Sequence, residues 1–179
     1  EFDSVENVSK EWISSQKKII QSKTIKFFKT HSCLADFKDR PFTTSETTLG
    51  GIYIVRDPRN IFTSIKNHFS MNDEEAFKML TDENRGLISD ENIFSSYTFI
   101  SSWSNHYISW IKNNKFRRLI IKYEDLINNT YETFRDIAVF SNTLLNITDG
   151  VNKEKLKSAI ETTSFKKLKA HEIKDGLHN

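Results

Sequence analysis

A short apolar run leads directly into a helix start near the middle of the chain, and this feature restricts the possible folds most strongly. The run GIYIVR (51–56) is continuous and rich in β-branched residues, which is typical of a parallel strand buried on both faces. Asp57 can cap a helix whose first residue is Pro58, because proline is favoured at that position. Apolar residues then recur at helical spacing as far as Phe69. The sequence therefore predicts a strand followed at once by a helix.

The rest of the chain continues this alternation of helices and strands. Apolar spacing predicts helices over 5–21, 92–114, from about 130, and over 152–161, with one short helix inside 73–90. Runs of β-branched and aromatic residues predict strands over 24–29 and 117–123. Strands that alternate with helices imply crossover connections, so we expect an α/β fold with three layers, a mostly parallel sheet flanked by helices. The length of 179 residues agrees with a single domain, 1–179.

Composition narrows the possible partners. The 26 basic residues nearly balance the 24 acidic ones, so the net charge of +2 does not predict a nucleic-acid partner. No apolar run approaches the ~20 residues that span a bilayer, so no membrane partner is expected. Cys33 is the one cysteine, which excludes an internal disulfide and fits a reducing compartment. The sequence has no metal-binding motif with paired cysteines, H-E-x-x-H or a calcium loop, and we predict no metal site.

Each predicted strand ends in a chemically rich segment: KTH (29–31), RDPRN (56–60) and KYED (122–125). Ligands of parallel sheets bind at the carboxyl ends of the strands, so these segments are the candidate site. Arg56 and the hydroxyl of Ser64, eight residues later, could grip a phosphate beside the helix start. Spacing alone supports an alternative equally well, in which Arg56 forms a surface ion pair with a carboxylate and Ser64 binds no ligand.

The remaining candidate side chains of these segments, and a histidine of the predicted helix over 92–114, also have an alternative structural interpretation. Lys29 and His31 would lie on one side of a strand, where the imidazole can take a proton and the ammonium can stabilise negative charge. An isolated histidine is more often a solvated loop residue. Tyr123 could stack on or hydrogen-bond to a nucleotide base, or its ring could simply cover the edge of the sheet. His106 lies with two tryptophans on the apolar stripe of its helix, so a core role ranks ahead of a polar one.

Taken together, these segments resemble the cytosolic-type sulfotransferase family. The matching pieces are KTH, YIVRDPRNIFTSIKNHF, SWSNHYISWI, LIIKYEDL and TTSF, in that order, over about residues 24–170. The family's arginine-to-serine interval of eight residues recurs as Arg56 to Ser64. The resemblance implies the P-loop nucleotide-kinase-like sulfotransferase fold. It also implies a cytoplasmic enzyme that needs no metal.

The resemblance assigns catalytic and phosphate-binding roles to positions of this chain. His31 matches the general base that takes the acceptor's proton, and Lys29 matches the lysine that offsets developing charge. Arg56 and Ser64 match the pair that holds the 3′-phosphate of the donor. That donor is 3′-phosphoadenosine 5′-phosphosulfate (PAPS), and the product is adenosine 3′,5′-bisphosphate. The acceptor is expected to be a small molecule with a hydroxyl or an amine.

The same comparison assigns the adenine contacts and an acceptor loop. Tyr123, Thr163 and Phe165 match residues that contact the adenine, with Phe165 stacking on the ring. The loop from Ser32 to Leu49 would line the acceptor pocket, and the resemblance leaves the acceptor itself open. Side chains of this loop that suit an apolar part are Phe37 and Phe42, and those that suit a polar acceptor are Lys38 and Arg40.

Two parts of the family pattern have no counterpart in this sequence. They are a phosphate loop of the type T-Y-P-K-S-G-T-T-W and a carboxyl-terminal R-K-G segment, so a truncated or partly ordered chain is expected. Two other functions stay open. One is a non-catalytic nucleotide-binding module of the same fold. The other is a phosphoryl-transfer enzyme, although its usual G-x-x-x-x-G-K-[ST] motif is not seen. The KTH histidine argues against a Golgi-type carbohydrate sulfotransferase.

Overall fold

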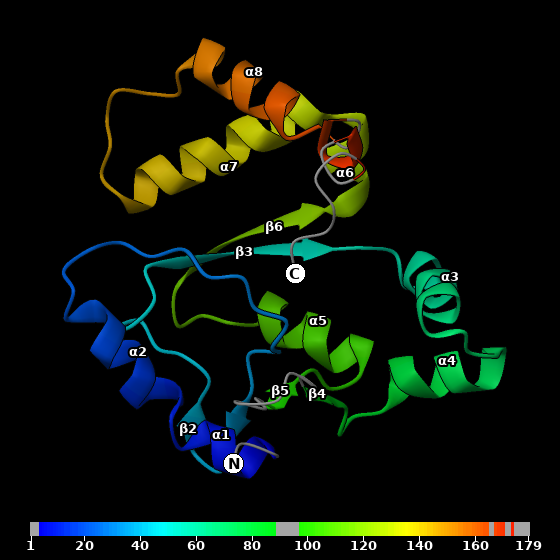
Figure 1. Ribbon diagram of the computed structural model, residues 1–179. Coiled ribbons are helices and arrows are strands. Elements are labelled where there is room, and N and C mark those ends of the chain that lie inside the picture. Colours follow the sequence, from blue (N-terminus) through cyan, green and yellow to red (C-terminus); the bar gives the residue numbers. More distant parts are fainter. Residues whose placement is uncertain (1–3, 89–96, 165–166, 171–172, 174–179) are drawn as a thin grey trace. The chain divides into compact units, whose positions relative to one another are not determined.

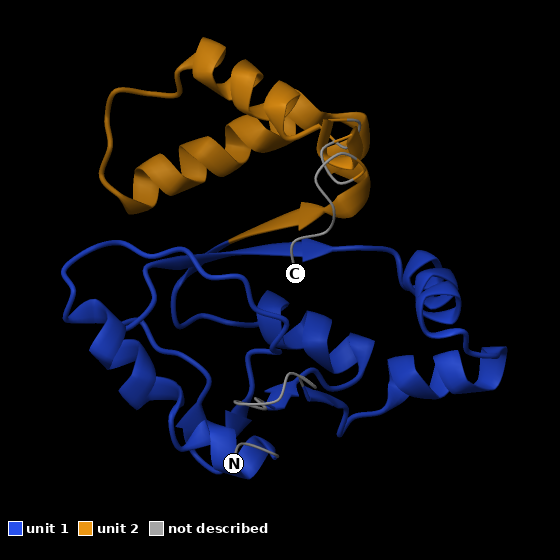
Figure 2. Ribbon diagram, in the orientation of Figure 1, with its two compact units in different colours: residues 1–118 blue, residues 119–179 orange. Residues whose placement is uncertain are grey.

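The computed structural model describes residues 4–88, 97–164, 167–170 and 173 (Figure 1). The chain divides into two compact units, Glu1–Arg118 and Leu119–Asn179, which Figure 2 shows in separate colours. Helices and strands are mixed along the chain, as predicted for an α/β protein. The prediction of one domain over 1–179 stays a prediction.

The first unit begins with two short helices, α1 (Val5–Ser9) and α2 (Trp12–Ile20). The sequence predicted one helix over 5–21, but the chain turns between these two segments. Trp12, at the start of α2, is buried and packs edge-on against Phe42, with ring centroids 5.4 Å apart. This aromatic contact fixes α2 against the long loop that follows it.

The strand predicted over 24–29 is wrong, because this segment has no regular secondary structure. Its aromatic side chains are open to solvent: Phe27 is 81% exposed and Phe28 is 70% exposed. A strand is stable only when a neighbour pairs with its backbone, whatever the propensity of its residues. The side-chain hydrogen bond at its start is local, between the hydroxyls of Ser22 and Thr24 at 2.9 Å.

The polar stretch over 30–49 contains a small hairpin that the sequence did not predict. Strands β1 (Asp36–Phe37) and β2 (Arg40–Pro41) pair in antiparallel register. The two residues between them, Lys38 and Asp39, have φ angles of 48° and 61°. Positive φ at both central positions is the conformation of a tight hairpin turn of type I′.

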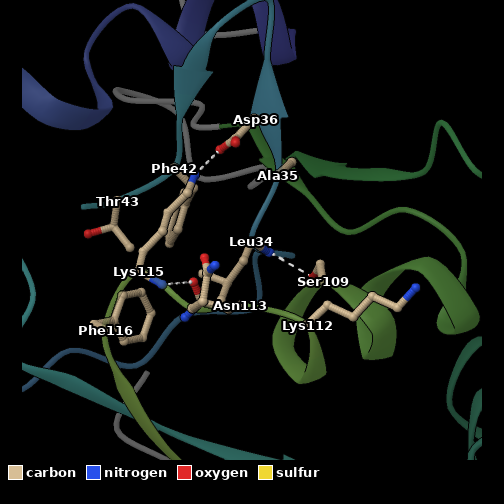
Figure 3. A pocket seen from close by; sticks show the side chains of 11 residues that line it. Leu34, Ala35, Asp36, Phe42, Thr43, Ser109, Lys112, Asn113, Lys115 and Phe116 are labelled. Carbon is tan, nitrogen blue, oxygen red and sulfur yellow. Dashed lines mark hydrogen bonds and ion pairs between the residues drawn. The ribbon is translucent and has the colours of Figure 1, made fainter. Parts of the chain in front are cut away.

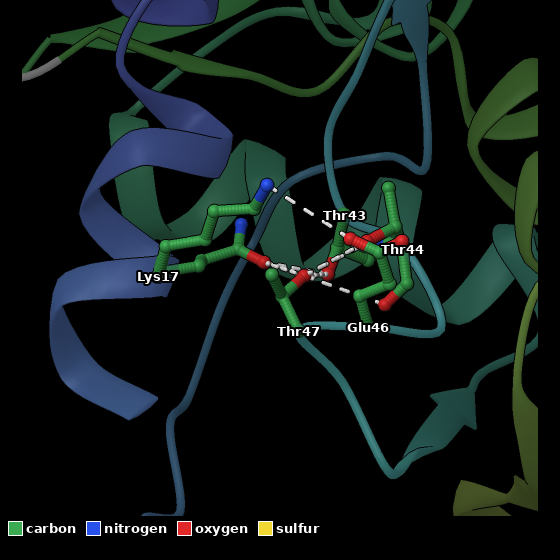
Figure 4. A network of polar contacts seen from close by, with 6 residues as sticks. Lys17, Thr43, Thr44, Glu46 and Thr47 are labelled. Atoms are coloured by element: carbon green, nitrogen blue, oxygen red, sulfur yellow. Dashed lines mark hydrogen bonds and ion pairs between the residues drawn. The ribbon is translucent and has the colours of Figure 1, made fainter. Parts of the chain in front are cut away.

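A hydrogen-bond network fastens the end of this stretch to α2 (Figure 4). Gln16 Nε2 donates to the carbonyl of Phe42 at 2.7 Å. Gln16 Oε1 accepts from the hydroxyls of Thr43 at 2.6 Å and Thr47 at 2.8 Å. Thr43 is buried, with 6% of its surface exposed. One amide therefore satisfies three polar groups of the loop.

We expect Gln16→Ala to lower the free energy of unfolding by about 1–3 kcal/mol, because it leaves partly buried loop groups without their partner. Urea denaturation of the full chain measures this change. Lys17→Ala is the matched control on the next residue of α2. Its ion pair with Glu46 is 3.9 Å long and well exposed, so its loss should change stability little. Equal unfolding midpoints for the two variants would contradict the role given to Gln16.

The predicted strand and helix at the centre of the chain are confirmed as β3 (Gly50–Val55) and α3 (Pro58–Phe69). Asp57 caps α3, and its side chain accepts from the backbone N–H two residues later at 2.9 Å. Burial of β3 on both faces is wrong, since Ile52 is 38% exposed and Ile54 is 51% exposed. The alternate side chains, on the opposite face, are half-buried.

The next part of the first unit differs from the prediction of a helix over 92–114. After α4 (Asp73–Thr81), the strands β4 (Gly86–Ile88) and β5 (Tyr97–Phe99) pair in antiparallel register. The helix itself is α5 (Trp103–Ile111). It begins at Trp103 because the side chain of the preceding serine accepts a backbone N–H of the first turn.

Helix α5 covers the inner face of β3 through aromatic contacts. Tyr53 stacks on Trp110 with ring centroids 5.1 Å apart and an interplanar angle of 3°. Trp110 also packs edge-on against Phe116 at 6.5 Å. A side chain at Gly51 would come within 3.0 Å of the Trp110 ring and 3.1 Å of the Phe116 ring. Glycine at this position lets the strand and helix approach closely.

Strand β6 (Arg117–Lys122) begins at the end of the first unit and continues into the second, as predicted for 117–123. Among the described residues of the second unit, β6 is followed by α6 (Tyr123–Asn128), α7 (Thr130–Leu144) and α8 (Lys153–Thr162), and residues 167–170 are also helical. The sequence predicted α7 and α8 but not α6. Thr133 Oγ1 of α7 donates to the carbonyl of Asp125 in α6 at 3.1 Å, which ties the two helices together.

Candidate functional site

The predicted site residues fall in both units. Lys29, His31, Arg56 and Ser64 belong to the first unit, and Tyr123 and Thr163 belong to the second. Phe165 lies outside the described residues.

Arg56 lies directly after β3, one residue ahead of the Asp57 cap of α3, and it is half-buried. Ser64 is exposed and lies two turns into α3. A guanidinium at a capped helix start is well placed for an anion, because the helix start presents backbone N–H groups and positive potential. The predicted strand–turn–helix arrangement of these residues is confirmed, whereas their phosphate-binding role stays a prediction.

The second arginine of this segment has a different environment. Arg59 Nε donates to both carboxylate oxygens of Asp57, at 3.0 and 3.2 Å. The Arg59 side chain is 88% exposed. The side-chain hydrogen bond of Arg59 and, to a smaller extent, its backbone N–H lower the pKa of the Asp57 carboxyl to about 2. Arg59 thus pairs with the helix cap.

Lys29 and His31 lie in the irregular segment that precedes β1, and both are exposed. The expectation that they point to one side rested on the strand over 24–29. Because that strand does not form, period-two alternation does not place these two side chains together. The structure does fix the backbone of His31, whose carbonyl oxygen lies 3.2 Å from His106 Nε2.

His106 makes polar contacts in addition to its place on the apolar stripe of α5. From the sequence, a core role ranked ahead of a polar one. Its Nδ1 lies 3.0 Å from Tyr53 Oη, and its ring packs against the Tyr53 ring at 5.6 Å. Burial lowers the pKa of the His106 imidazole, the hydrogen bond to the backbone of His31 offsets part of this shift, and the charges of Arg85 and His31 add to the lowering. A helical period reveals the face of a side chain, but it does not reveal a partner 75 residues away.

The lowered pKa of His106 predicts how stability depends on pH. The unfolded chain binds a proton here near pH 6.5 and the folded chain binds it only at lower pH. His106 therefore stabilises the fold fully above about pH 6.5, and this contribution is lost as the pH falls. We expect the free energy of unfolding to decrease more steeply from pH 7.5 to 5 in the wild type than in His106→Gln. Parallel urea denaturation series measure this difference, and equal slopes would contradict the prediction.

A cavity of about 240 Å³ lies in the first unit between the loop after His31 and the end of α5 (Figure 3). Its lining includes Leu34, Phe42 and Phe116, together with polar groups of Asn113 and Lys112. Of the loop residues predicted to suit an acceptor, Phe42 lines this cavity. Two others bind residues of α1: Lys38 Nζ contacts Glu6 at 2.9 Å, and Arg40 contacts Ser9 at 3.4 Å.

The two described adenine-contact candidates of the second unit lie at helix ends. Tyr123 follows β6 as the first residue of α6 and is 37% exposed. Thr163 ends α8, where its hydroxyl donates to the carbonyl of Ala159 at 2.7 Å. Both side chains are accessible to a ligand, and their contacts with adenine stay predictions.

The described residues contain neither a metal-binding cluster nor a membrane-spanning helix. No group of three or more His, Cys, Asp or Glu side chains there is arranged to hold a metal ion. No helix of the same residues is long and apolar enough to cross a membrane.

Comparison with known proteins identifies the family. No curated protein matches the sequence. The family model of the sulfotransferase domain matches residues 4–177, which is nearly the whole chain. This match confirms the predicted α/β sulfotransferase fold and indicates a transferase. The chain belongs to the sulfotransferase domain family.

Proposed function

We propose that this protein transfers a sulfuryl group from PAPS to a hydroxyl or amine of a small molecule. The observation that carries the proposal is the half-buried Arg56 between β3 and the capped start of α3, in a chain of the sulfotransferase family. A nucleotide donor with a 3′-phosphate supplies the anion that this position suits. Family membership makes a sulfuryl donor the first choice among such nucleotides.

The resemblance to the family assigns the donor's binding to five residues. Arg56 and Ser64 hold the 3′-phosphate, the arginine by charge-assisted hydrogen bonds and the serine by its hydroxyl. Tyr123, Thr163 and Phe165 contact the adenine. Support for these roles comes from the matching sequence segments and from the accessible positions of Ser64, Tyr123 and Thr163.

The transfer itself is an in-line displacement at sulfur. The acceptor oxygen or nitrogen forms a bond to sulfur while the bond from sulfur to the 5′-phosphate oxygen breaks. His31 takes the proton of the acceptor, and adenosine 3′,5′-bisphosphate leaves with the electron pair. Lys29 offsets the negative charge that builds on the transferring group. The proposed step uses no metal ion.

The setting proposed for this reaction is the cytoplasm, with no nucleic-acid or membrane partner. The lone Cys33 is 3% exposed, and burial raises the pKa of its thiol to about 11, so it is poorly suited to form disulfides. The near-neutral balance of charge agrees with a small-molecule acceptor.

Labelled PAPS, incubated with the full chain and a panel of hydroxyl and amine acceptors, tests the proposal. We expect label to pass to at least one acceptor class, and the rate to be the same with and without EDTA. Tight binding of adenosine 3′,5′-bisphosphate without transfer to any acceptor would favour a binding module. Transfer from ATP that stops when EDTA removes Mg²⁺ would favour a phosphoryl-transfer enzyme.

A further inference from the structure

We propose that one face of α5 positions the general base by holding the backbone of three residues in the segment from His31 to Leu34. We call the three side chains of this face the α5 clamp; they are His106, Ser109 and Trp110. The inference rests on the proposed function, because it assumes that His31 is the base. It adds positioning residues that do not themselves touch the reacting atoms.

The α5 clamp follows from helical geometry. Its members are spaced i, i+3 and i+4, so they lie on one face of α5. Each of them bonds a backbone group of the segment: His106 Nε2 to the carbonyl of His31 at 3.2 Å, Trp110 Nε1 to the carbonyl of Ser32 at 3.2 Å, and Ser109 Oγ to the N–H of Leu34 at 3.0 Å.

The remaining residue of the segment is held by β5. The N–H of Cys33 donates to the carbonyl of Phe99 at 3.0 Å. All four residues from His31 to Leu34 therefore have a fixed backbone group. Burial changes at the same place, since residues 20–31 are exposed while Ser32 is 7% exposed and Cys33 is 3% exposed. His31 is thus the first anchored residue after an open segment, with its side chain still exposed.

The orientation of His106 is itself fixed by β3. A carbonyl oxygen only accepts, so His106 Nε2 must carry the hydrogen that faces His31. In the neutral ring Nδ1 is then an acceptor, and the hydroxyl of Tyr53 donates to it. Tyr53 belongs to β3, and Arg56 directly follows this strand three residues later. One strand therefore supports both the clamp histidine and the arginine assigned to the donor's 3′-phosphate.

This arrangement has a catalytic consequence. A general base must lie within hydrogen-bond reach of the proton that it takes, and a displacement of about 1 Å can cost about 10²-fold in rate. The residues before His31 are exposed, so packing restrains the chain little from that side. Loss of the His106 contact should therefore lower kcat while leaving donor binding, which depends on other residues, unchanged.

The test compares three substitutions in the full chain. His106→Phe keeps an aromatic ring but removes the N–H donor, whereas His106→Gln keeps an N–H donor at similar reach. Asn105→Ala alters the neighbouring exposed residue of α5 and is the matched control. We expect His106→Phe to lower kcat by about 10- to 100-fold with an unchanged Kd for adenosine 3′,5′-bisphosphate. His106→Gln should regain most of that loss, which a merely structural role of the ring would not produce.

Hydrogen exchange gives a readout that does not depend on activity. Ser109→Ala removes the acceptor of the Leu34 N–H, so exchange at that amide should become faster than in the wild type. Unchanged exchange, or a kcat of His106→Phe equal to that of Asn105→Ala, would overturn the clamp while sulfuryl transfer by the wild type stands. If the wild type neither transferred a sulfuryl group nor bound the nucleotide, the proposed function would be refuted. The proposal that the α5 clamp positions a general base would then fail as well.

Discussion

Replacing His31 by alanine should lower kcat by about 10²–10⁴-fold, the range that a general base contributes. The acceptor would then keep its proton until the bond to sulfur forms, so the nucleophile would be weaker in the transition state. The affinity for adenosine 3′,5′-bisphosphate should stay unchanged, because the proposed donor contacts lie on other elements. Steady-state kinetics and isothermal titration of the same preparations measure both quantities.

A matched control for this variant lies in the same open segment. Lys26→Ala changes another exposed side chain five residues earlier and should leave kcat at the wild-type level. A decrease in both variants would indicate that the segment as a whole matters. If His31→Ala retains the turnover of Lys26→Ala, then His31 is not the base, whereas family membership and donor binding would stand.

The part of the fold around Arg56 could be predicted because its signals are local. Asp57 as a cap and Pro58 as the first helical residue act within one turn of the chain. The structure has both in these positions, and β3 ends one residue before Arg56. Helices α7 and α8 were likewise found from apolar spacing, although α8 contributes little buried surface of its own.

The segments that could not be predicted depend on distant partners. Residues 24–29 have strand-forming composition, yet Phe27 and Phe28 are exposed and the segment is irregular. The β-propensity of a residue reflects how well it fits a pleated surface. It does not indicate whether a neighbouring strand is present to pair with it. The long helix expected over 92–114 was an error of the same kind, because helical periodicity was extended across residues 97–99, which form β5.

The candidate site shows the same limit at the level of single residues. Apolar spacing correctly indicated that His106 faces inward, and that favoured a core role over a polar one. Its contacts with Tyr53 and with the carbonyl of His31 join three separate segments of the chain. Contacts of this type are invisible in one sequence, so the sequence named the proposed base without the residues that fix its backbone.

The two arginines of the RDPRN segment give the second large prediction. Arg56→Ala should raise the Kd for adenosine 3′,5′-bisphosphate by about 10- to 100-fold, because a charged hydrogen bond to the 3′-phosphate contributes about 1.5–3 kcal/mol. Arg59→Ala is the matched control three residues later. Its guanidinium is 88% exposed and already pairs with Asp57, so we expect little change in nucleotide affinity.

The ligand itself can separate a direct contact from an indirect one. Adenosine 5′-phosphate lacks the 3′-phosphate, so Arg56→Ala and the wild type should bind it equally well if Arg56 contacts that group. Arg56→Lys should recover only part of the affinity for the bisphosphate, since an ammonium keeps the charge but loses the planar pair of donors. A similar loss of affinity for both nucleotides would show that Arg56 acts through the fold of the strand end. If only Arg59→Ala lowered the affinity for the bisphosphate, the 3′-phosphate would be assigned to Arg59, which pairs with Asp57.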